Sequence, residues 1–319
     1  MAVCIFLLCT LRSVLSEVDS MLEASSATRL VTRHSVSLTF NLPVAYESRI
    51  QSVPGVKQIA KTIWFGGSLP TKKEGQADGS ESDSTTDWSK FFNNMAVDAD
   101  KFFPMYPELT IPPDQWQSFR ETRTGCLLGS KLAKKFNWKV GDKIPIMGTI
   151  WQPKQGQVWD FNIAGTYDGE PGVDKTNFFF RYDYLNENRA GGDGLVGWYV
   201  VKIADASQAQ QMAAKFDGMF ANSSAETKTT TEKGFVEGFA KQIGDIGAIM
   251  IAILVAVLFT MLLVAANTMA QSVRERTSEV GVLKTLGFSN TSVLMLVLSE
   301  SVLIAVLGGG LGLAVAWAI

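Results

Sequence analysis

The stretch Arg274 to Trp317 reads RERTSEVGVLKTLGFSNTSVLMLVLSESVLIAVLGGGLGLAVAW and decides the fold of this chain. One long apolar run ends just before it, a short charged segment with an amphipathic motif and a glycine follows, and a second apolar run begins. A polytopic membrane protein needs that order to turn its chain around on one face of the membrane. The stretch therefore predicts a helical membrane protein with a structured elbow at 274–290.

The two apolar runs that flank the elbow predict transmembrane helices at 246–273 and 291–319. The first contains no charged residue, and the second contains one, Glu300. About 20 apolar residues are enough to span a hydrocarbon core of roughly 30 Å. A buried core helix is the alternative for each run, but buried helices rarely stay uncharged for so long. The overall composition hides these runs, since 46% hydrophobic and 19% charged residues with a net charge of −2 also fit an ordinary globular protein.

A third apolar run, 1–11, is too short to cross a membrane alone. A signal peptide would carry basic residues before such a run and a small-residue cleavage site after it, whereas here Arg12 follows the run. We expect 1–11 to be the outer end of a first transmembrane helix. Because Ile319 also ends the sequence on an apolar run, we expect further sequence before Met1 and after Ile319, including a fourth helix.

Basic residues predict the orientation of these helices. The elbow carries Arg274, Arg276 and Lys284, and short basic loops stay on the cytoplasmic side. The segment 12–245 then lies outside the cytoplasm, since one helix precedes it and one follows it. Long domains translocate largely regardless of their charge, so the near-neutral balance of 12–245 adds no information.

The segment 12–245 is long enough for one large or two small domains. Runs rich in β-branched or aromatic residues predict strands at Ser35–Asn41, Val56–Phe65, Lys143–Gly148, Val158–Tyr167, Asn177–Tyr184 and Val196–Ile203. Helical spacing predicts helices at Leu127–Phe136, at Ser207–Phe220 with Asp205 as N-cap, and from Glu232 into the second span. The expected fold is therefore an α+β extracytoplasmic domain inserted between transmembrane α-helices.

Two polar segments interrupt this domain. Thr71–Asp87 shows no hydrophobic period, and Asn186–Gly197 is rich in glycine, so both are expected to form loops. We place a subdomain boundary near each segment and expect two subdomains.

The elbow matches an Arg-x-x-Glu-[Val/Ile]-Gly-x-Leu-Lys-x-Leu-Gly pattern at Arg276, Glu279, Val280, Gly281, Leu283, Lys284, Leu286 and Gly287. It thereby resembles the FtsX-like permease domain of MacB-type ABC transporters, in which this pattern follows the second membrane helix. The resemblance implies that the segment is a coupling helix that docks on an ATPase.

Upstream, three patterns resemble the MacB-like periplasmic core domain. They are Val53–Val56, Leu128–Ala133 followed by Val140–Ile144, and Phe161–Thr166. Each is degenerate alone, but their order and spacing ahead of a permease pattern are specific. The resemblance covers roughly residues 15 to 319 and includes no ATPase domain.

The elbow residues themselves agree with a docking role. Val280, Leu283 and Leu286 form an apolar ridge at helical spacing, and charged residues that can pair with a partner flank this ridge. Gly287 suits a left-handed position after a helix, and Ser289 can cap the helix that follows. The alternative is a solvated loop with incidental charges.

Glu300 lies about one-third of the way along its span, and an ionisable residue in a membrane helix suggests a function by default. Alternatively, it sits near the cytoplasmic interface and bonds to Ser299, Ser301 or another helix. Since the family often carries an acidic residue here, we favour a structural or gating contact over a proton relay.

No pattern indicates catalysis or a cofactor. His34 is the only histidine and the cysteines form no cluster, so a transition-metal site is not expected. The sequence contains no G-x-x-x-x-G-K-[ST] phosphate-binding loop and no G-x-S-x-G. If 98–100 form a strand, Asp98 and Asp100 share one face of it, and a solvated face is favoured over a cation-binding pair. We predict a non-catalytic subunit with no catalytic, metal or cofactor site.

The resemblance implies an ABC transporter permease of the MacB type in the bacterial inner membrane, with its large domain on the periplasmic side. Such a permease transmits ATP-driven motion of a partner ATPase through its helices to the outer domains, without passing substrate through a membrane pore. The implied partners are the ATPase, a second permease copy or paralogue, a membrane-fusion protein and membrane lipids, with no nucleic acid. A signalling subunit that controls a cell-wall hydrolase, a lipoprotein-release permease and a membrane-anchored enzyme are the alternatives.

Overall fold

The computed structural model describes residues 9, 26–70, 90, 92–170 and 172–318. The chain divides into two compact units, one of Ser20–Glu237 and one that includes Gly238–Ile319. We call them the domain and the helical unit. Nearly all of the apolar run 1–11 and the whole polar segment 71–87 lie outside the described residues, so the predictions made for them are not addressed by the structure.

The domain is built on a mixed sheet with the strand order β13-β1-β12-β3-β5-β10-β7-β9-β8-β4, to which β6 adds beside β9. Two pairs of neighbours, β5 with β10 and β7 with β9, run parallel, and the others run antiparallel. The strands are β1 (Arg29–His34), β3 (Val56–Trp64), β4 (Gly67–Ser68), β5 (Asn94–Val97), β6 (Leu109–Thr110), β7 (Gly125–Gly129), β8 (Lys143–Gly148), β9 (Trp159–Gly169), β10 (Phe178–Arg181), β12 (Trp198–Ile203) and β13 (Thr227–Thr231). A separate ribbon pairs β2 (Leu42–Pro43) with β11 (Leu195–Val196).

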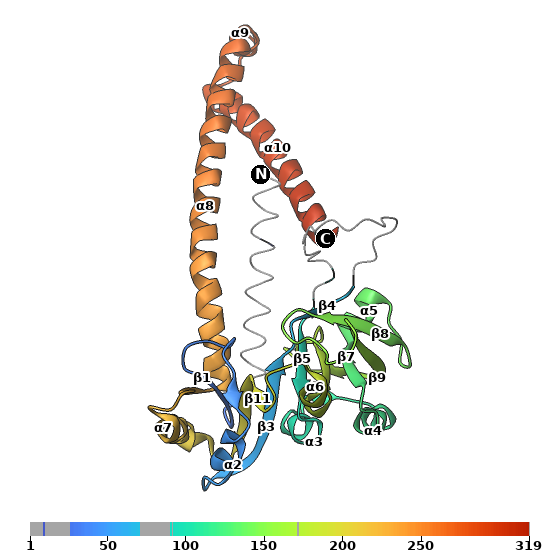
Figure 1. Cartoon of the computed structure of the whole chain (residues 1–319). Helices are drawn as coiled ribbons and strands as arrows, with labels where there is room; N and C mark the ends of the chain where they lie inside the picture. The colour runs from blue at the N-terminus through green and yellow to red at the C-terminus, as the bar shows by residue number, and fades with distance from the viewer. Residues whose placement is uncertain (1–8, 10–25, 71–89, 91, 171, 319) are drawn as a thin grey trace, which may run out of the picture. The chain divides into compact units, whose positions relative to one another are not determined.

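Short helices connect and cover these strands (Figure 1). They are α2 (Tyr46–Gln51), α3 (Ala99–Phe102), η2 (Phe103–Met105), α4 (Pro113–Glu121), α5 (Ser130–Phe136), α6 (Tyr182–Asn188), η3 (Ala206–Gln208) and α7 (Ala209–Phe220). The mixture of strands and helices confirms the expected α+β class.

Strand β10 lies between two hydrophobic cores because its side chains alternate across the sheet. Phe178 and Phe180 belong to one core, in which their rings lie 5.1 and 4.7 Å from that of Phe161. Phe179 belongs to the other core, 5.5 Å from the ring of Phe102. The domain therefore buries apolar side chains on both faces of this strand.

Several predicted elements of the domain were wrong in part. The expected strand Asn177–Tyr184 ends as β10 at Arg181, and helix α6 begins at the next residue. The expected strand Ser35–Asn41 is a turn region, because the strand is β1, which ends at His34 where its pairing with Thr227 of β13 ends. The expected helix Leu127–Phe136 begins as strand β7, and α5 starts only at Ser130. At the change, a Cβ on Gly129 would collide with the backbone oxygen of Lys175, so the close approach of these two segments requires glycine.

The two expected subdomains are not separate in the described part of the chain. Strands β3 and β5, which flank the polar segment 71–87, pair directly with each other. Strands β10 and β12, which flank the glycine-rich segment 186–197, belong to the same sheet. Because hydrogen bonding continues across both expected boundaries, residues 20–237 form one compact unit.

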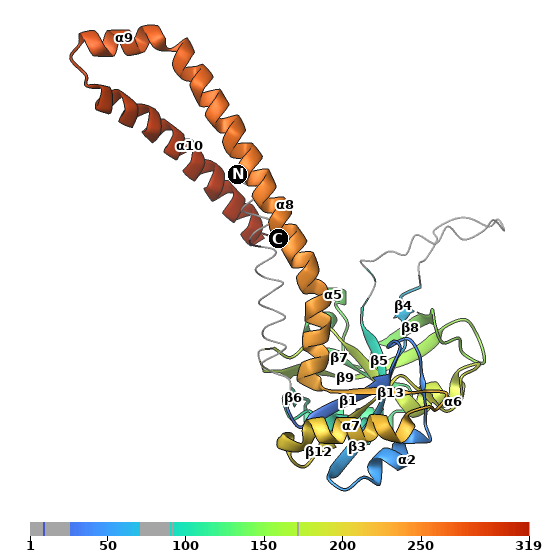
Figure 2. The same cartoon turned by 90° about the vertical axis from the view of Figure 1, so that its left-hand side faces the viewer.

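The helical unit contains most of a 44-residue helix, α8 (Glu232–Glu275), followed by α9 (Thr277–Thr285) and the 29-residue α10 (Asn290–Ala318). Helix α9 forms the tip from which α10 returns (Figure 2). Among the described residues, Ile251–Gln271 is the one segment long and apolar enough to cross a membrane, with a mean hydropathy of 2.4 over 21 residues. The assignment of α10 as a span stays a prediction.

Candidate functional site

The elbow is a short helix set between two long ones. Helix α8 ends at Glu275, and Arg276, with φ −94° and ψ 17°, separates it from α9. The hydroxyl of Thr277 donates to the backbone oxygen of Arg274 at 2.7 Å, and the N–H of Val280 donates to that of Arg276 at 3.0 Å. Local hydrogen bonds thus shape this corner, which is helical rather than a solvated loop.

The end of α9 is a Schellman motif. The N–H of Phe288 donates to the oxygen of Leu283 and that of Gly287 to the oxygen of Lys284, both at 3.1 Å. Gly287 has φ +94°, a conformation that other residues adopt only with strain. The Ser289 hydroxyl then accepts from the N–H of Ser292 at 3.2 Å and caps α10. The predictions for Gly287 and Ser289 are confirmed.

The apolar surface of the elbow differs from the ridge expected from the sequence. Of that ridge, Val280 and Leu283 are partly covered, and only Leu286 is well exposed, at 70%. Val282 and Phe288 are also exposed, at 59% and 49%. Val282 and Leu286 are four residues apart and therefore share one face of α9. We call Val282, Leu286 and Phe288 the apolar elbow face.

Sequence reasoning missed Val282 and Phe288. The spacing of four between Val282 and Leu286 was a usable signal, but the spacing of three from Val280 to Leu286 fits a helix as well. Only the exposure of individual side chains in the structure shows which of the two helix faces is available to a partner.

The charged and small residues of the family pattern lie on the same elbow. Arg276, Glu279, Gly281 and Lys284 are all exposed. Helical geometry places Glu279 beside the apolar elbow face and Lys284 beside Val280. Glu300 lies in α10, but its side chain is outside what the structure describes, so its gating role stays a prediction.

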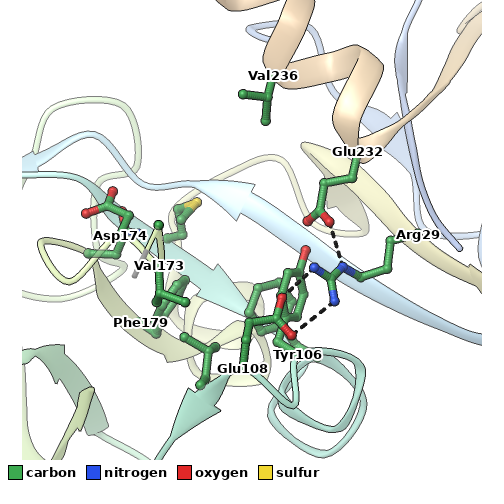
Figure 3. A pocket seen from close by; sticks show the side chains of 13 residues that line it. Arg29, Tyr106, Glu108, Val173, Asp174, Phe179, Glu232 and Val236 are labelled. Carbon is green, nitrogen blue, oxygen red and sulfur yellow. Dashed lines mark hydrogen bonds and ion pairs between the residues drawn. The ribbon is translucent and has the colours of Figure 1, made fainter. Parts of the chain in front are cut away.

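A second group of polar residues lies in the domain, around Arg29 of β1 (Figure 3). Its Nε donates to Glu232 at 2.6 Å, and its two terminal nitrogens donate to the two carboxylate oxygens of Glu108. Nη1 also donates to the backbone oxygen of Met105 at 2.9 Å. Burial alone would lower the pKa of Arg29, but the carboxylates of Glu232 and Glu108 outweigh it and raise that pKa above its ordinary value.

This group holds the first turn of α8 against the domain. Glu232 is the first residue of α8, and its carboxylate also accepts the N–H of Ser26 at 3.0 Å. The Arg29 guanidinium lies 4.2 Å above the ring of Tyr106. Burial and the nearby Glu232 carboxylate raise the pKa of the Tyr106 hydroxyl well above its ordinary value, so this group stays neutral.

Beside Arg29 the domain has a cavity of about 250 Å³, which we call the Arg29 pocket. Its lining also includes Met95, Phe102, Leu109, Val173, Asp174, Asn177, Phe179 and Val236. Figure 3 shows Val173, Asp174 and Phe179 on one side of the pocket and Arg29 with Glu232 on the other. No sequence pattern predicted this pocket.

The placement of Asp98 and Asp100 along one strand was wrong. Asp98 precedes α3 and Asp100 lies in its first turn. Asp98 forms an ion pair with Lys61 at 3.1 Å, and Asp100 forms one with Arg120 at 2.7 Å. These carboxylates are therefore paired with cations within the domain. Across the part of the chain that the structure describes, no group of three or more histidine, cysteine or acidic residues is arranged to hold a metal ion.

Comparison with known families assigns the whole chain. Residues 1–218 match the MacB-like periplasmic core domain, and residues 218–319 match the FtsX-like permease C-terminal domain. The chain therefore belongs to the MacB/FtsX-like ABC transporter permease family. The elbow lies in the second of these regions, and the Arg29 pocket takes residues from both.

Solved structures with low overall similarity to this chain include two transporter domains. The periplasmic region of MacB from Actinobacillus actinomycetemcomitans has a TM-score of 0.46 and 9% identity over 70% of this chain and 95% of that one. The extracellular domain of the noncanonic ABC-type transporter YknZ from Gram-positive bacteria has a TM-score of 0.42 and 10% identity over 64% of this chain and 100% of that one. Among curated proteins, none matched this chain by sequence.

Proposed function

We propose that this chain is the non-catalytic permease subunit of a MacB-type ABC transporter in the cytoplasmic membrane. It would couple ATP hydrolysis by a separate ATPase to export or handling of a substrate outside the cell. The observation that carries this proposal is the continuity of α8. This 44-residue helix begins at the buried ion pairs of the domain and ends at the exposed elbow.

The length of α8 fits a mechanical role. At 1.5 Å per residue it is about 66 Å long, which exceeds a hydrocarbon core of roughly 30 Å. A helix without an internal break can carry a displacement from one end to the other. Under the proposal, the ATPase would move the elbow, and α8 would pass that motion to its first turn, where Glu232 is bonded to Arg29.

The apolar elbow face is the surface proposed to seat in the ATPase. An exposed cluster of apolar side chains next to charged residues is typical of a docking site, in which the apolar residues supply affinity and the charges supply specificity. A second permease copy or a paralogue would present the same elbow to the second ATPase subunit.

Co-purification with the cognate ATPase, and the ATP turnover of the complex in lipid nanodiscs, test this proposal. A Val282→Glu, Leu286→Glu double variant should lower the affinity for the ATPase by about tenfold or more, because a charge would be buried without a partner. Both residues are exposed, so the elbow itself should fold normally. An Asn290→Glu, Thr291→Glu double variant, which adds the same two charges at exposed positions outside the apolar elbow face, is the matched control. Unchanged binding and turnover in the double variant would refute docking through this face.

The finer role is decided by the third protein in the complex. A membrane-fusion protein that binds the domain would support export. A cell-wall hydrolase would support a signalling role instead, and a lipoprotein carrier would support lipoprotein release. Each of these outcomes is compatible with the same elbow, so the elbow variants and this test are independent.

A further inference from the structure

The Arg29 pocket combines apolar walls with an excess of negative charge. Glu108, Glu232 and Asp174 line it, and among the described lining residues Arg29 is the only basic one. The Arg29 donors already bond to Glu232, Glu108 and the oxygen of Met105. Lys175, next to Asp174 in sequence, forms its ion pair with Asp168 at 2.5 Å instead. The lining therefore has three carboxylates against one guanidinium.

The walls between these charges are aromatic and aliphatic. The rings of Phe102 and Tyr106 are stacked 4.5 Å apart, and the ring of Phe179 lies 5.5 Å from that of Phe102. Val173, Leu109 and Met95 also belong to the apolar lining. Aromatic faces attract cations as well as apolar groups. The aromatic walls and the carboxylates of the pocket therefore both favour a ligand that is positively charged.

We propose that the Arg29 pocket binds a small organic cation, namely a protonated amine that carries an apolar or aromatic body. The body would lie against Phe102, Phe179 and Val173, and the ammonium group would lie near Glu108 and Glu232. A bare metal ion would leave the apolar walls unused, and an anion would meet the excess of carboxylates. A cavity of about 250 Å³ limits the ligand to a small molecule.

The site also includes part of α8. Glu232 and Val236 are one turn apart on α8, and both line the pocket. A bound amine would therefore touch the first turn of this helix. The binding inference itself does not depend on ATPase coupling, so its test can fail while the proposed function holds, and the reverse is equally true.

Three probes of matched shape test the charge preference: 4-phenylbutylamine, 4-phenylbutanol and 4-phenylbutyrate. The full chain in nanodiscs, labelled with ¹³C-methyl methionine, offers Met95 as a reporter in the pocket wall. Met95→Leu identifies its signal. We expect a saturable shift of the Met95 methyl signal with the amine, at least fivefold weaker binding of the alcohol, and no shift with the acid.

Methionines elsewhere in the chain distinguish binding in the pocket from probe molecules that merely dissolve in the lipid. Met261 and Met269 lie in the apolar part of α8, so their signals report probes dissolved in the bilayer. An amine that moves these signals but leaves Met95 unchanged would overturn the proposal. Equal binding of the amine and the alcohol would overturn the charge preference and leave only an apolar cavity.

Charge variants complete the test. Glu108→Gln keeps the shape of the side chain and should weaken amine binding by about tenfold, since it removes one carboxylate from beside the ammonium group. Asp174→Asn, at the other side of the pocket, should weaken it less and gives a second variant if Glu108→Gln disturbs folding. Glu121→Gln lies on α4 outside the pocket and is the matched control. Unchanged amine affinity in both pocket variants would contradict the inference.

Discussion

In the domain Phe161 is completely buried, whereas in the helical unit Leu262 is 65% exposed. Many other leucine, valine and isoleucine side chains of α8 and α10 are exposed as well. Water would make such a surface unfavourable, since soluble proteins rarely expose large apolar patches. The two regions thus use apolar side chains in two ways: the domain packs them inside, whereas the helical unit leaves many of them exposed, as the proposed membrane location requires. Matched substitutions in the two regions can test this difference.

The largest expected effect concerns the buried ion pairs of the domain. Arg29→Met would leave Glu108 and Glu232 buried without their cation, and should lower the free energy of unfolding by about 3–5 kcal/mol. The matched control is Arg120→Met, because Arg120 and Asp100 form an exposed pair that should contribute less than about 1 kcal/mol. Urea unfolding of the full chain in nanodiscs, followed by tryptophan fluorescence, measures both. Equal losses of unfolding free energy in the two variants would show that the Arg29 ion pairs stabilise the domain no more than an exposed pair does.

The next effect compares one substitution in both regions. Leu128 of β7 is buried in the domain core, so Leu128→Ala should cost about 3 kcal/mol by leaving a cavity. Leu262→Ala should change the domain's free energy of unfolding by less than about 1 kcal/mol, because lipid tails are as apolar as the leucine they replace. The same unfolding experiment serves here. A comparable cost at Leu262 would indicate that this side chain is packed against protein.

A smaller effect is expected at the end of α9. Gly287→Ala places a Cβ at φ +94°, which should destabilise the elbow by about 1 kcal/mol. Gly281→Ala, inside the same helix, should instead stabilise it, since alanine favours helix more than glycine does. Hydrogen exchange of the α9 amides should therefore become faster in the first variant and slower in the second. The opposite order would refute the Schellman ending.

The smallest effect is a dependence on pH within the domain. Burial alone would raise the pKa of Glu47, but hydrogen bonds and charge from Lys101 and Lys61 outweigh it and hold that pKa below the ordinary 4.5. A carboxylate with a lowered pKa stabilises the fold above its unfolded pKa, and this contribution disappears as the pH falls through the folded pKa. Glu47→Gln should therefore make unfolding less sensitive to pH below about 4.5. Unfolding curves at several pH values check this, and an unchanged slope would contradict it.

The elbow was the more predictable region because its structure is local. The bonds from Phe288 and Gly287 reach back five and three residues, and the Ser289 cap reaches forward three. The Arg29 pairs could not be predicted, since they join residues 79 and 203 positions apart. Strand β1 was missed for the same reason: its neighbours, β12 and β13, lie far away in sequence.

Strand β10 shows, within one element, the difference between what its own residues determine and what distant contacts determine. Strand β10 contains three consecutive phenylalanines, Phe178 to Phe180, which supply ring volume to both cores. A shift of one residue in the register of β10 would exchange the two faces of the strand. Most of the core positions now filled by a phenylalanine would still be filled by one. The identity of these side chains therefore leaves the alignment ambiguous.

The polar residues at the two ends of this strand resolve that ambiguity. Before it, Asn177 accepts a hydrogen bond from the side-chain amide of Asn93 at 2.6 Å. At its end, Arg181 donates a hydrogen bond to the backbone oxygen of Arg120 on α4. A slipped strand would break both contacts and leave the mostly buried Asn177 without this partner. We therefore expect these end contacts to select the native alignment of the strand during folding.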